Sequence, residues 1–240
     1  MADPQVIRRS GSTTAAAQID EGLRAHMNAV YGLMSMGMVF TGLVAWFVGN
    51  NEALLATFFT GPVRWIVMFA PLIFVFAFGA MINRVSENTA RLMFFAFAGL
   101  MGLSLAWIFA VFTNFSIAQT FFVTAIAFAG LSIWGYTTKR DISGWGSFLI
   151  MGVIGLIVAS IINIWLGSPA LHFAVSIIGL LIFAGLTAYD TQKIKNTYLA
   201  MAHHGQTEWL GKSAIMGALN LYLDFVNMFM FLLNFMGAQE

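Results

Sequence analysis

The chain has 240 residues, of which 60% are hydrophobic and 9% are charged, and its formal net charge is +1. A soluble domain carries about 25% charged residues, so this composition excludes an ordinary water-facing surface and also the basic surface of a nucleic-acid-binding protein. The chain has no cysteine, which excludes disulfides, thiolate metal sites and thiol chemistry.

Seven apolar runs are long enough to cross a bilayer as helices, because a spanning helix needs about 20 mostly apolar residues. In chain order they cover residues 29–48, 65–82, 92–113, 119–136, 146–166, 170–189 and 213–236. The runs do not alternate between polar and apolar residues as barrel strands do. We therefore expect an all-α integral membrane protein with seven transmembrane helices.

A polar segment, residues 1–24, precedes the first apolar run. We expect it to be a disordered cytoplasmic tail, followed by one seven-helix transmembrane domain over residues 25–240. Arg8 and Arg9 weakly resemble a twin-arginine export signal. The apolar run begins well downstream of them and spans a full bilayer, which favours an uncleaved first helix.

The basic residues between the predicted helices give an orientation. If the N-terminus is inside, Arg64 is the one basic residue in an outer loop. The inner set is Arg8, Arg9, Arg24, Arg84, Arg91, Lys139, Arg140, Lys193, Lys195 and Lys212. Basic residues gather in cytoplasmic loops. We expect a multi-pass cell (inner) membrane protein with its N-terminus in the cytoplasm and its C-terminus outside.

The last predicted helix carries an ionisable residue deep within its apolar run, Asp224. A charged side chain in hydrocarbon costs several kcal/mol unless it is paired or hydrated. Helical spacing places it on one polar face with Ser213, Gly217, Asn220, Asn227 and Asn234. This polar stripe cannot face lipid, so we expect the helix to pack inside the bundle with the stripe against other helices or a water-filled cavity.

A second carboxylate, Asp190, closes the sixth apolar run. Nothing in the sequence breaks a helix between Asp190 and Ala202. If the helix continues there, Asp190 and Asp224 have similar depth, and we expect them to face each other. Two carboxylates close together in a low dielectric cannot both ionise easily and share a proton. The pair would then be a proton-dependent latch that opens, or admits a cation, when the proton is lost.

Other interpretations of these residues stay open. An intramembrane aspartate can join helices through backbone hydrogen bonds, and Asn220 and Asn227 suit the same structural role. Arg84, at the inner end of the second predicted helix, is the nearest basic residue that could modulate the pair.

The sequence indicates no enzyme and no cofactor. There is no nucleotide-binding glycine motif and no nucleophile–His–acid set. Tyr189–Asp190 matches half of the signature of an intramembrane aspartyl protease, but Leu223–Asp224 has no glycine context. The pair His203–His204 has no third ligand at metal-binding spacing.

Two runs are similar to the signature segments of the Bax inhibitor (transmembrane Bax-inhibitor-motif) family: GLTAYDTQK at residues 185–193 and ALNLYLDFVNMF at residues 218–229. The segments 31–42 (YGLMSMGMVFTG), 121–125 (FFVTA) and 134–143 (WGYTTKRDIS), with Asn163 after Gly155, also resemble that family. The similarity covers the chain from about residue 26, and the short inner loops suit a bacterial member.

The resemblance implies a seven-helix fold in which the last helix is central and surrounded by the other six. It also implies a cytoprotective, pH-sensitive calcium leak in which Asp190 and Asp224 sense protons, and an arginine that locks one aspartate. Arg84 matches that arginine only in approximate position. Calcium prefers six to eight oxygen ligands. Two carboxylates with Asn220, Asn227, Thr191 and water give a partial shell, suited to transient passage.

Two alternatives to the leak remain. The resemblance includes a bacterial branch described as modulating a membrane-bound AAA protease, so the chain could be an interaction protein in the bilayer. A proton-coupled transporter is the third hypothesis, and it would show saturable substrate exchange, which a leak does not.

Overall fold

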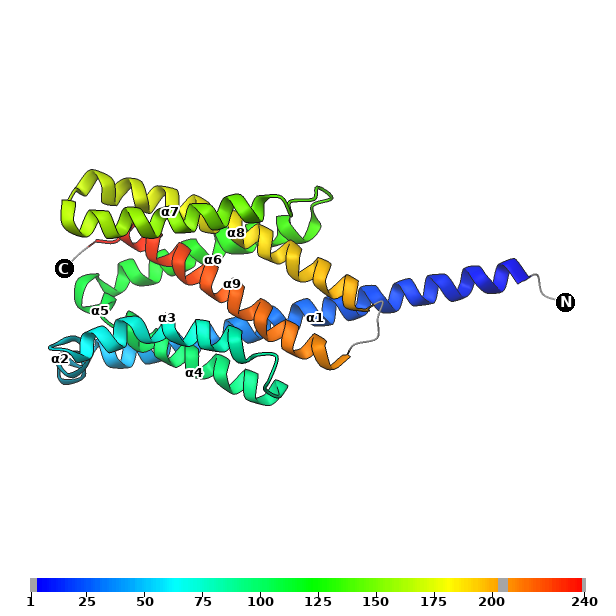
Figure 1. Cartoon of the computed structure of the whole chain (residues 1–240), viewed down its shortest axis with the longest axis horizontal. Helices are drawn as coiled ribbons and strands as arrows, with labels where there is room; N and C mark the ends of the chain where they lie inside the picture. Colours follow the sequence, from blue (N-terminus) through cyan, green and yellow to red (C-terminus); the bar gives the residue numbers. More distant parts are fainter. Residues whose placement is uncertain (1–3, 203–206, 239–240) are drawn as a thin grey trace.

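The computed structural model describes the backbone of residues 4–202 and 207–238 and the side chains of residues 18–202 and 209–238. In these ranges the regular elements are helices: α1 (Pro4–Gly49), α2 (Glu52–Phe59), α3 (Val63–Met81), α4 (Glu87–Leu105), α5 (Ile108–Val111), α6 (Asn114–Thr137), α7 (Trp145–Leu166), α8 (Pro169–Ala202) and α9 (Thr207–Met236). Figure 1 shows them as one elongated bundle.

Seven helical segments of the described chain are long and apolar enough to span a membrane: part of α1 (Gln18–Gly49), α3, α4 with α5 (Glu87–Val111), α6, α7, α8 and most of α9 (Trp209–Met236). This confirms the all-α integral membrane class and the seven predicted spans. The third predicted span, 92–113, contains a turn that separates α4 from α5. Helix α2 is a short segment that precedes α3.

Local capping explains where several helices begin and end. The side chains of Ser86 and Thr113 accept hydrogen bonds from the amides of Thr89 and Ser116, and so satisfy free N–H groups in the first turns of α4 and α6. Helix α7 ends at Leu166 and is capped by Gly167, whose φ of 60° lies in the left-handed region that favours glycine. The turns therefore have local sequence causes, and the spans between them are fixed by length and hydrophobicity.

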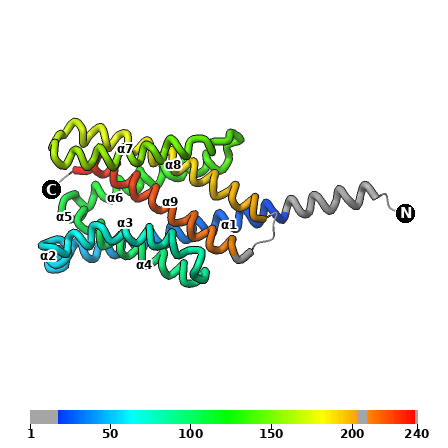
Figure 2. Tube along the Cα trace, in the orientation of Figure 1, coloured from blue at the N-terminus to red at the C-terminus, as the bar shows by residue number. Residues whose placement is uncertain are grey.

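Helix α9 crosses the bundle diagonally, between a group formed by α1, α3 and α4 and a group formed by α6, α7 and α8 (Figures 1 and 2). It packs against α1, α4, α6 and α8. In the most apolar part of α9, 67% of the residues are buried inside the bundle, whereas in α7 the share is 11%. The expectation that all six other spans surround α9 is not confirmed, because α3 packs on α4 and α7 packs on α8.

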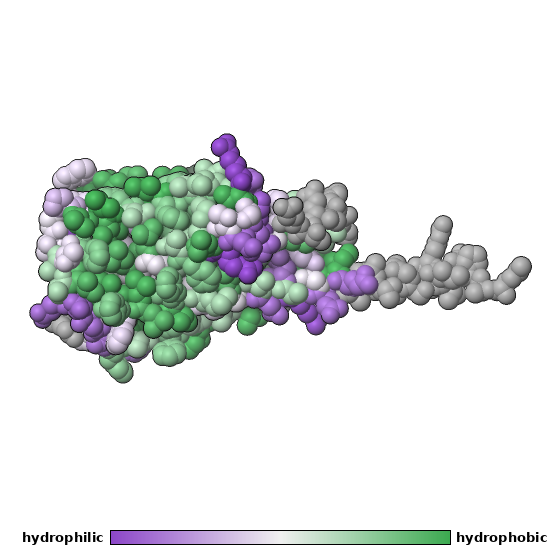
Figure 3. Space-filling model, turned by 90° about the horizontal axis from the view of Figure 1, so that it is seen from below, coloured by the Kyte–Doolittle hydropathy of each residue, from purple (hydrophilic) through white to green (hydrophobic). Residues whose placement is uncertain are grey.

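The outside of the bundle suits a lipid environment. Large apolar side chains are exposed along α3, α6 and α7, and hydrophobic residues cover the flank of the bundle in Figure 3, with hydrophilic residues near its two ends. One end carries the α3–α4 turn, the α6–α7 loop and the C-terminal end of α8 (Figure 1). We call it the basic end, because Arg84, Lys139 and Arg140 lie there.

Two predictions concern parts of the chain that the structure describes little. Helix α1 begins at Pro4, inside the segment 1–24 for which the sequence predicts a polar tail. The side chains of residues 1–17 lie outside the described part, so the tail stays a prediction. His203 and His204 also lie outside the described residues.

Candidate functional site

Helix α8 continues without interruption to Ala202. Asp190 therefore lies inside a long helix and not at its end, as the lack of a helix breaker after it predicts. Helices α8 and α9 make the most extensive contact between any two helices of the described chain. A side chain on Cα of Gly217 in α9 would meet Ile194 of α8, so the small residue of the polar stripe lets the two helices approach closely.

Both aspartates are buried in this contact. Asp190 is 9% exposed and Asp224 is 4% exposed. Asp190 lies on α8 and Asp224 lies on α9, so the two carboxylates belong to the same helix–helix contact. The Oδ2 atom of Asp224 is buried and has no hydrogen-bond partner among the described residues. A buried oxygen without a partner is costly, and a second carboxylate beside it raises the cost of ionising both.

Threonines of α8 line the same region. Thr187 and Thr191 are fully buried, and their hydroxyls donate to the carbonyl oxygens of Phe183 and Thr187. The Thr187 hydroxyl also lies 3.3 Å from the sulfur of Met228 in α9. The hydroxyl of Tyr31 in α1 lies 3.5 Å from that of Thr191. The hydroxyls of α1 and α8 and the sulfur of Met228 in α9 therefore meet at the segment of α8 that carries Asp190.

The other predicted modulators lie at different distances from the pair. Asn220 and Asn227 are half-buried on α9, and the Asn227 amide donates to the Leu223 carbonyl, which leaves its own oxygen free to accept. Arg84 lies exposed in the α3–α4 turn, and within the described residues no ion pair joins it to either aspartate. Asn234, the last member of the predicted stripe, is exposed, because it lies near the end of α9.

A cleft of about 380 Å³ opens at the basic end, between α3 and the α8–α9 pair. Asn83 of the α3–α4 turn, Lys193 of α8 and Lys212 of α9 line it, and it reaches Asn220. Asn220 lies one helical turn before Asp224. The cleft therefore connects the basic end with the part of α9 next to the buried carboxylates.

Contacts that the sequence did not predict fix α8 beside this site. Gln192, two residues after Asp190, accepts a hydrogen bond from the amide of Ile142 at 2.9 Å and donates to the carbonyl of Arg140 at 2.8 Å. The Lys195 ammonium donates to the carbonyl of Tyr136 at 2.7 Å. These bonds hold the C-terminal end of α6 and the α6–α7 loop on α8. The sequence shows only that a glutamine follows Asp190 in the apolar helix. It does not indicate which backbone groups that glutamine contacts.

The sequence of the chain matches a known family over most of its length. Residues 23–240 match the family model described as "Inhibitor of apoptosis-promoting Bax1". The chain belongs to the Bax inhibitor family. As a Bax inhibitor family protein with seven spanning helices, it is an integral membrane protein, and the family resemblance expected from the sequence is confirmed.

Bacterial relatives of this family cover nearly the whole chain. The chain is 46% identical over 220 residues to the "Inner membrane protein YbhL" of Escherichia coli K12, which covers 91% of this chain and 94% of that relative. It is 43% identical to an uncharacterized protein of Caulobacter vibrioides over 94% of this chain and 93% of the relative. An uncharacterized membrane protein of Streptococcus pyogenes is 34% identical over 93% of this chain and 96% of the relative.

Proposed function

We propose that this chain is a pH-sensitive cation leak, with calcium as the permeant ion, gated by a proton shared between Asp190 and Asp224. The observation that carries the proposal is the burial of both carboxylates in the closely packed contact between α8 and α9. Two adjacent charges in a dry interior repel strongly, and one proton between them removes the repulsion.

The proton sets the state of the gate. While it is shared, the pair holds one negative charge and α8 stays packed on α9. When the proton leaves, the two charges push the helices apart or recruit a cation between them. Past Asp224 along α9, the side chains of Met228 and Leu233 are buried and apolar, as in a closed pathway. Raising the pH therefore opens the leak, and lowering it closes the leak.

The ion's coordination follows from the oxygens near the pair. The cleft between α3 and α8–α9 gives access from the basic end to Asn220. The two carboxylates, the side-chain oxygens of Asn220 and Asn227, Thr191 and water would supply a partial calcium shell. No group of three or more His, Asp or Glu side chains at metal-binding distance occurs in the described chain. The partial shell around the aspartate pair therefore favours transient passage of calcium over its storage.

We place the protein in the cell's inner membrane with the basic end in the cytoplasm. The name of the Escherichia coli relative supports the location. The gathering of basic residues at one end supports the orientation, since cytoplasmic loops are enriched in lysine and arginine. A reporter fused after Ala238 should behave as extracytoplasmic, and a reporter in the α6–α7 loop as cytoplasmic. The opposite pattern would overturn the orientation.

The proposal is tested by calcium flux into proteoliposomes that contain a trapped calcium indicator. The wild-type protein should admit calcium faster as the pH is raised. Asp190→Asn and Asp224→Asn each leave only one ionisable carboxyl at the pair, so both variants should lose most of this pH dependence. Asp20→Asn, on the exposed face of α1, is the matched control and should keep it.

Two outcomes would contradict the mechanism. If both aspartate variants kept the wild-type pH profile, the pair would not be the gate. If the folded wild-type protein admitted no calcium at any pH, the leak itself would be excluded. The interaction with a membrane protease expected from the resemblance would then be the hypothesis to test, by deleting residues 2–24 and measuring partner binding.

A further inference from the structure

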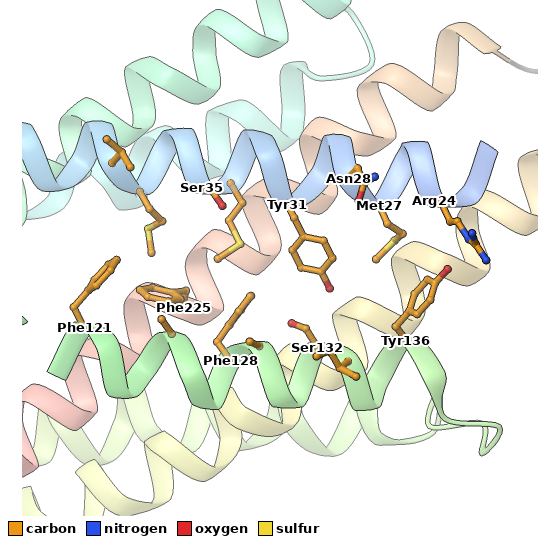
Figure 4. A pocket seen from close by; sticks show the side chains of 16 residues that line it. Arg24, Met27, Asn28, Tyr31, Ser35, Phe121, Phe128, Ser132, Tyr136 and Phe225 are labelled. Carbon is orange, nitrogen blue, oxygen red and sulfur yellow. The ribbon is translucent and has the colours of Figure 1, made fainter. Parts of the chain in front are cut away.

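A second, larger cleft lies on the other side of the bundle, between α1 and α6. Its volume is about 670 Å³, within the range of about 300–1,000 Å³ that is typical of ligand sites. Helix α1 packs on α4, α8 and α9, and α6 packs on α8 and α9, but α1 and α6 are not closely packed against each other. Figure 4 shows side chains of both helices projecting into the space between them.

The cleft is polar at the basic end and apolar beyond it. Arg24 and Asn28 of α1 and Tyr136 of α6 line its polar part, and Val39 and Phe121 line its apolar part. From residue 24 to residue 39 the α1 backbone rises about 22 Å. One leaflet of a bilayer, half of a hydrocarbon core of about 30 Å plus its headgroups, has similar depth. This order of polarity matches a single phospholipid molecule.

The polar part of the cleft holds two groups that have no ion-pair or hydrogen-bond partner among the described side chains. The guanidinium of Arg24 forms no ion pair among the described residues. Ser132 is 5% exposed, and its Oγ atom is buried without a hydrogen-bond partner on the cleft wall. In Figure 4 the side chain of Ser132 points into the cleft, opposite Tyr31. A buried hydroxyl without a partner is costly unless a ligand or water satisfies it.

We propose that the cleft between α1 and α6 binds an anionic glycerophospholipid of the leaflet at the basic end. Its phosphate lies at Arg24, whose planar fork matches phosphate oxygens. An ester carbonyl accepts the hydrogen bond that Ser132 can donate. One acyl chain runs along the apolar part to Phe225 of α9, which also lines the cleft. The lipid is the occupant because both helices are long and apolar enough to span the membrane, so the cleft between them lies at the depth of the bilayer.

The first test measures which lipids the purified protein retains. Native mass spectrometry of the detergent-solubilised protein should show one phosphatidylglycerol retained in preference to phosphatidylcholine, and added inorganic phosphate should not displace it. Arg24→Gln should weaken this retention by about tenfold or more, because it removes a charge-assisted contact with phosphate. Arg140→Gln is the control, since the described contacts of Arg140 use its backbone and its side chain is exposed at the same end.

A bulky residue in the cleft gives an independent test of the acyl-chain position. Ala129→Phe fills the cleft wall and should abolish retention, whereas Ile126→Phe, on the outer face of α6 where Ile126 is 75% exposed, should leave it unchanged. An unchanged melting temperature shows that each variant is folded. Equal retention by wild type, Arg24→Gln and Ala129→Phe would overturn the proposal, and so would displacement of the lipid by phosphate.

The absence of cysteine allows a second measurement in a bilayer. A fluorophore on Ser35→Cys sits in the cleft, and one on Met36→Cys sits on the outer face, where Met36 is 55% exposed. Phosphatidylglycerol with brominated chains should quench the first label at a mole fraction well below that needed for the second. Identical quenching curves would mean that lipid only surrounds the protein and does not occupy the cleft.

Discussion

The same Gly→Ala substitution at two glycines of α6 should change the stability of the protein to different extents. A Cβ atom on Gly135 would collide with the carbonyl oxygen and Cα of Ala188 in α8, whereas one on Gly130 would have no neighbour within 4 Å. Ala188 lies two residues before Asp190, so this close approach positions the part of α8 that carries the site. The pair Gly135→Ala and Gly130→Ala therefore tests whether α6 holds that part of α8 in place.

The magnitude follows from two effects. Replacing glycine by alanine inside a helix gains about 1 kcal/mol for either variant. Only Gly135→Ala also forces two backbones apart, and overpacking of this kind costs about 1–3 kcal/mol. The difference between the two variants in free energy of unfolding should thus be about 1–3 kcal/mol, with Gly135→Ala the less stable. Denaturant titration of the purified protein in detergent measures it. Equal stability of the two variants would refute the close α6–α8 approach.

Two further predictions concern the α6–α7 loop. Gln192→Ala removes the hydrogen bond that the Ile142 amide donates, and should therefore increase hydrogen exchange at that amide. The matched control Gln119→Ala, at an exposed site of α6, should leave the Ile142 amide protected. Equal protection of this amide in the two variants would contradict the hydrogen bond. Hydrogen bonds from the Ser143 side chain and amide hold the pKa of Asp141 below its usual value. This carboxylate stays ionised near neutral pH, so Asp141→Asn should leave the pH profile of calcium flux unchanged, and a shifted profile would show that a loop carboxylate titrates in the gate.

The sequence predicted the fold well because its signal is local. Each span is a long apolar run, and hydrophobicity over about 20 residues decides whether a helix crosses the bilayer. The length of α8 was also predictable, since no proline or glycine interrupts the chain from Asp190 to Ala202. The turn between α4 and α5 was not predicted, because the residues around Ala106 and Trp107 remain apolar through it.

The site was predictable only in part. The spacing of polar residues placed Asp224 on a face that cannot meet lipid, and the absence of a helix breaker brought Asp190 to a similar depth. The approach of Tyr31 to Thr191 joins residues 160 positions apart, so it depends on how α1 packs on α8. The cleft between α1 and α6 has the same origin. Neither helix reveals by its own composition that it does not pack against the other.

The most direct test of the gate is infrared spectroscopy of the shared proton in the proteoliposomes used for flux. The protonated carboxyl band that is lost in the double variant Asp190→Asn, Asp224→Asn reports the pair in the wild-type protein. We predict that this band is present at the pH where calcium flux is low and disappears over the pH interval in which flux rises. A pair that is fully ionised while the leak is closed would contradict the mechanism.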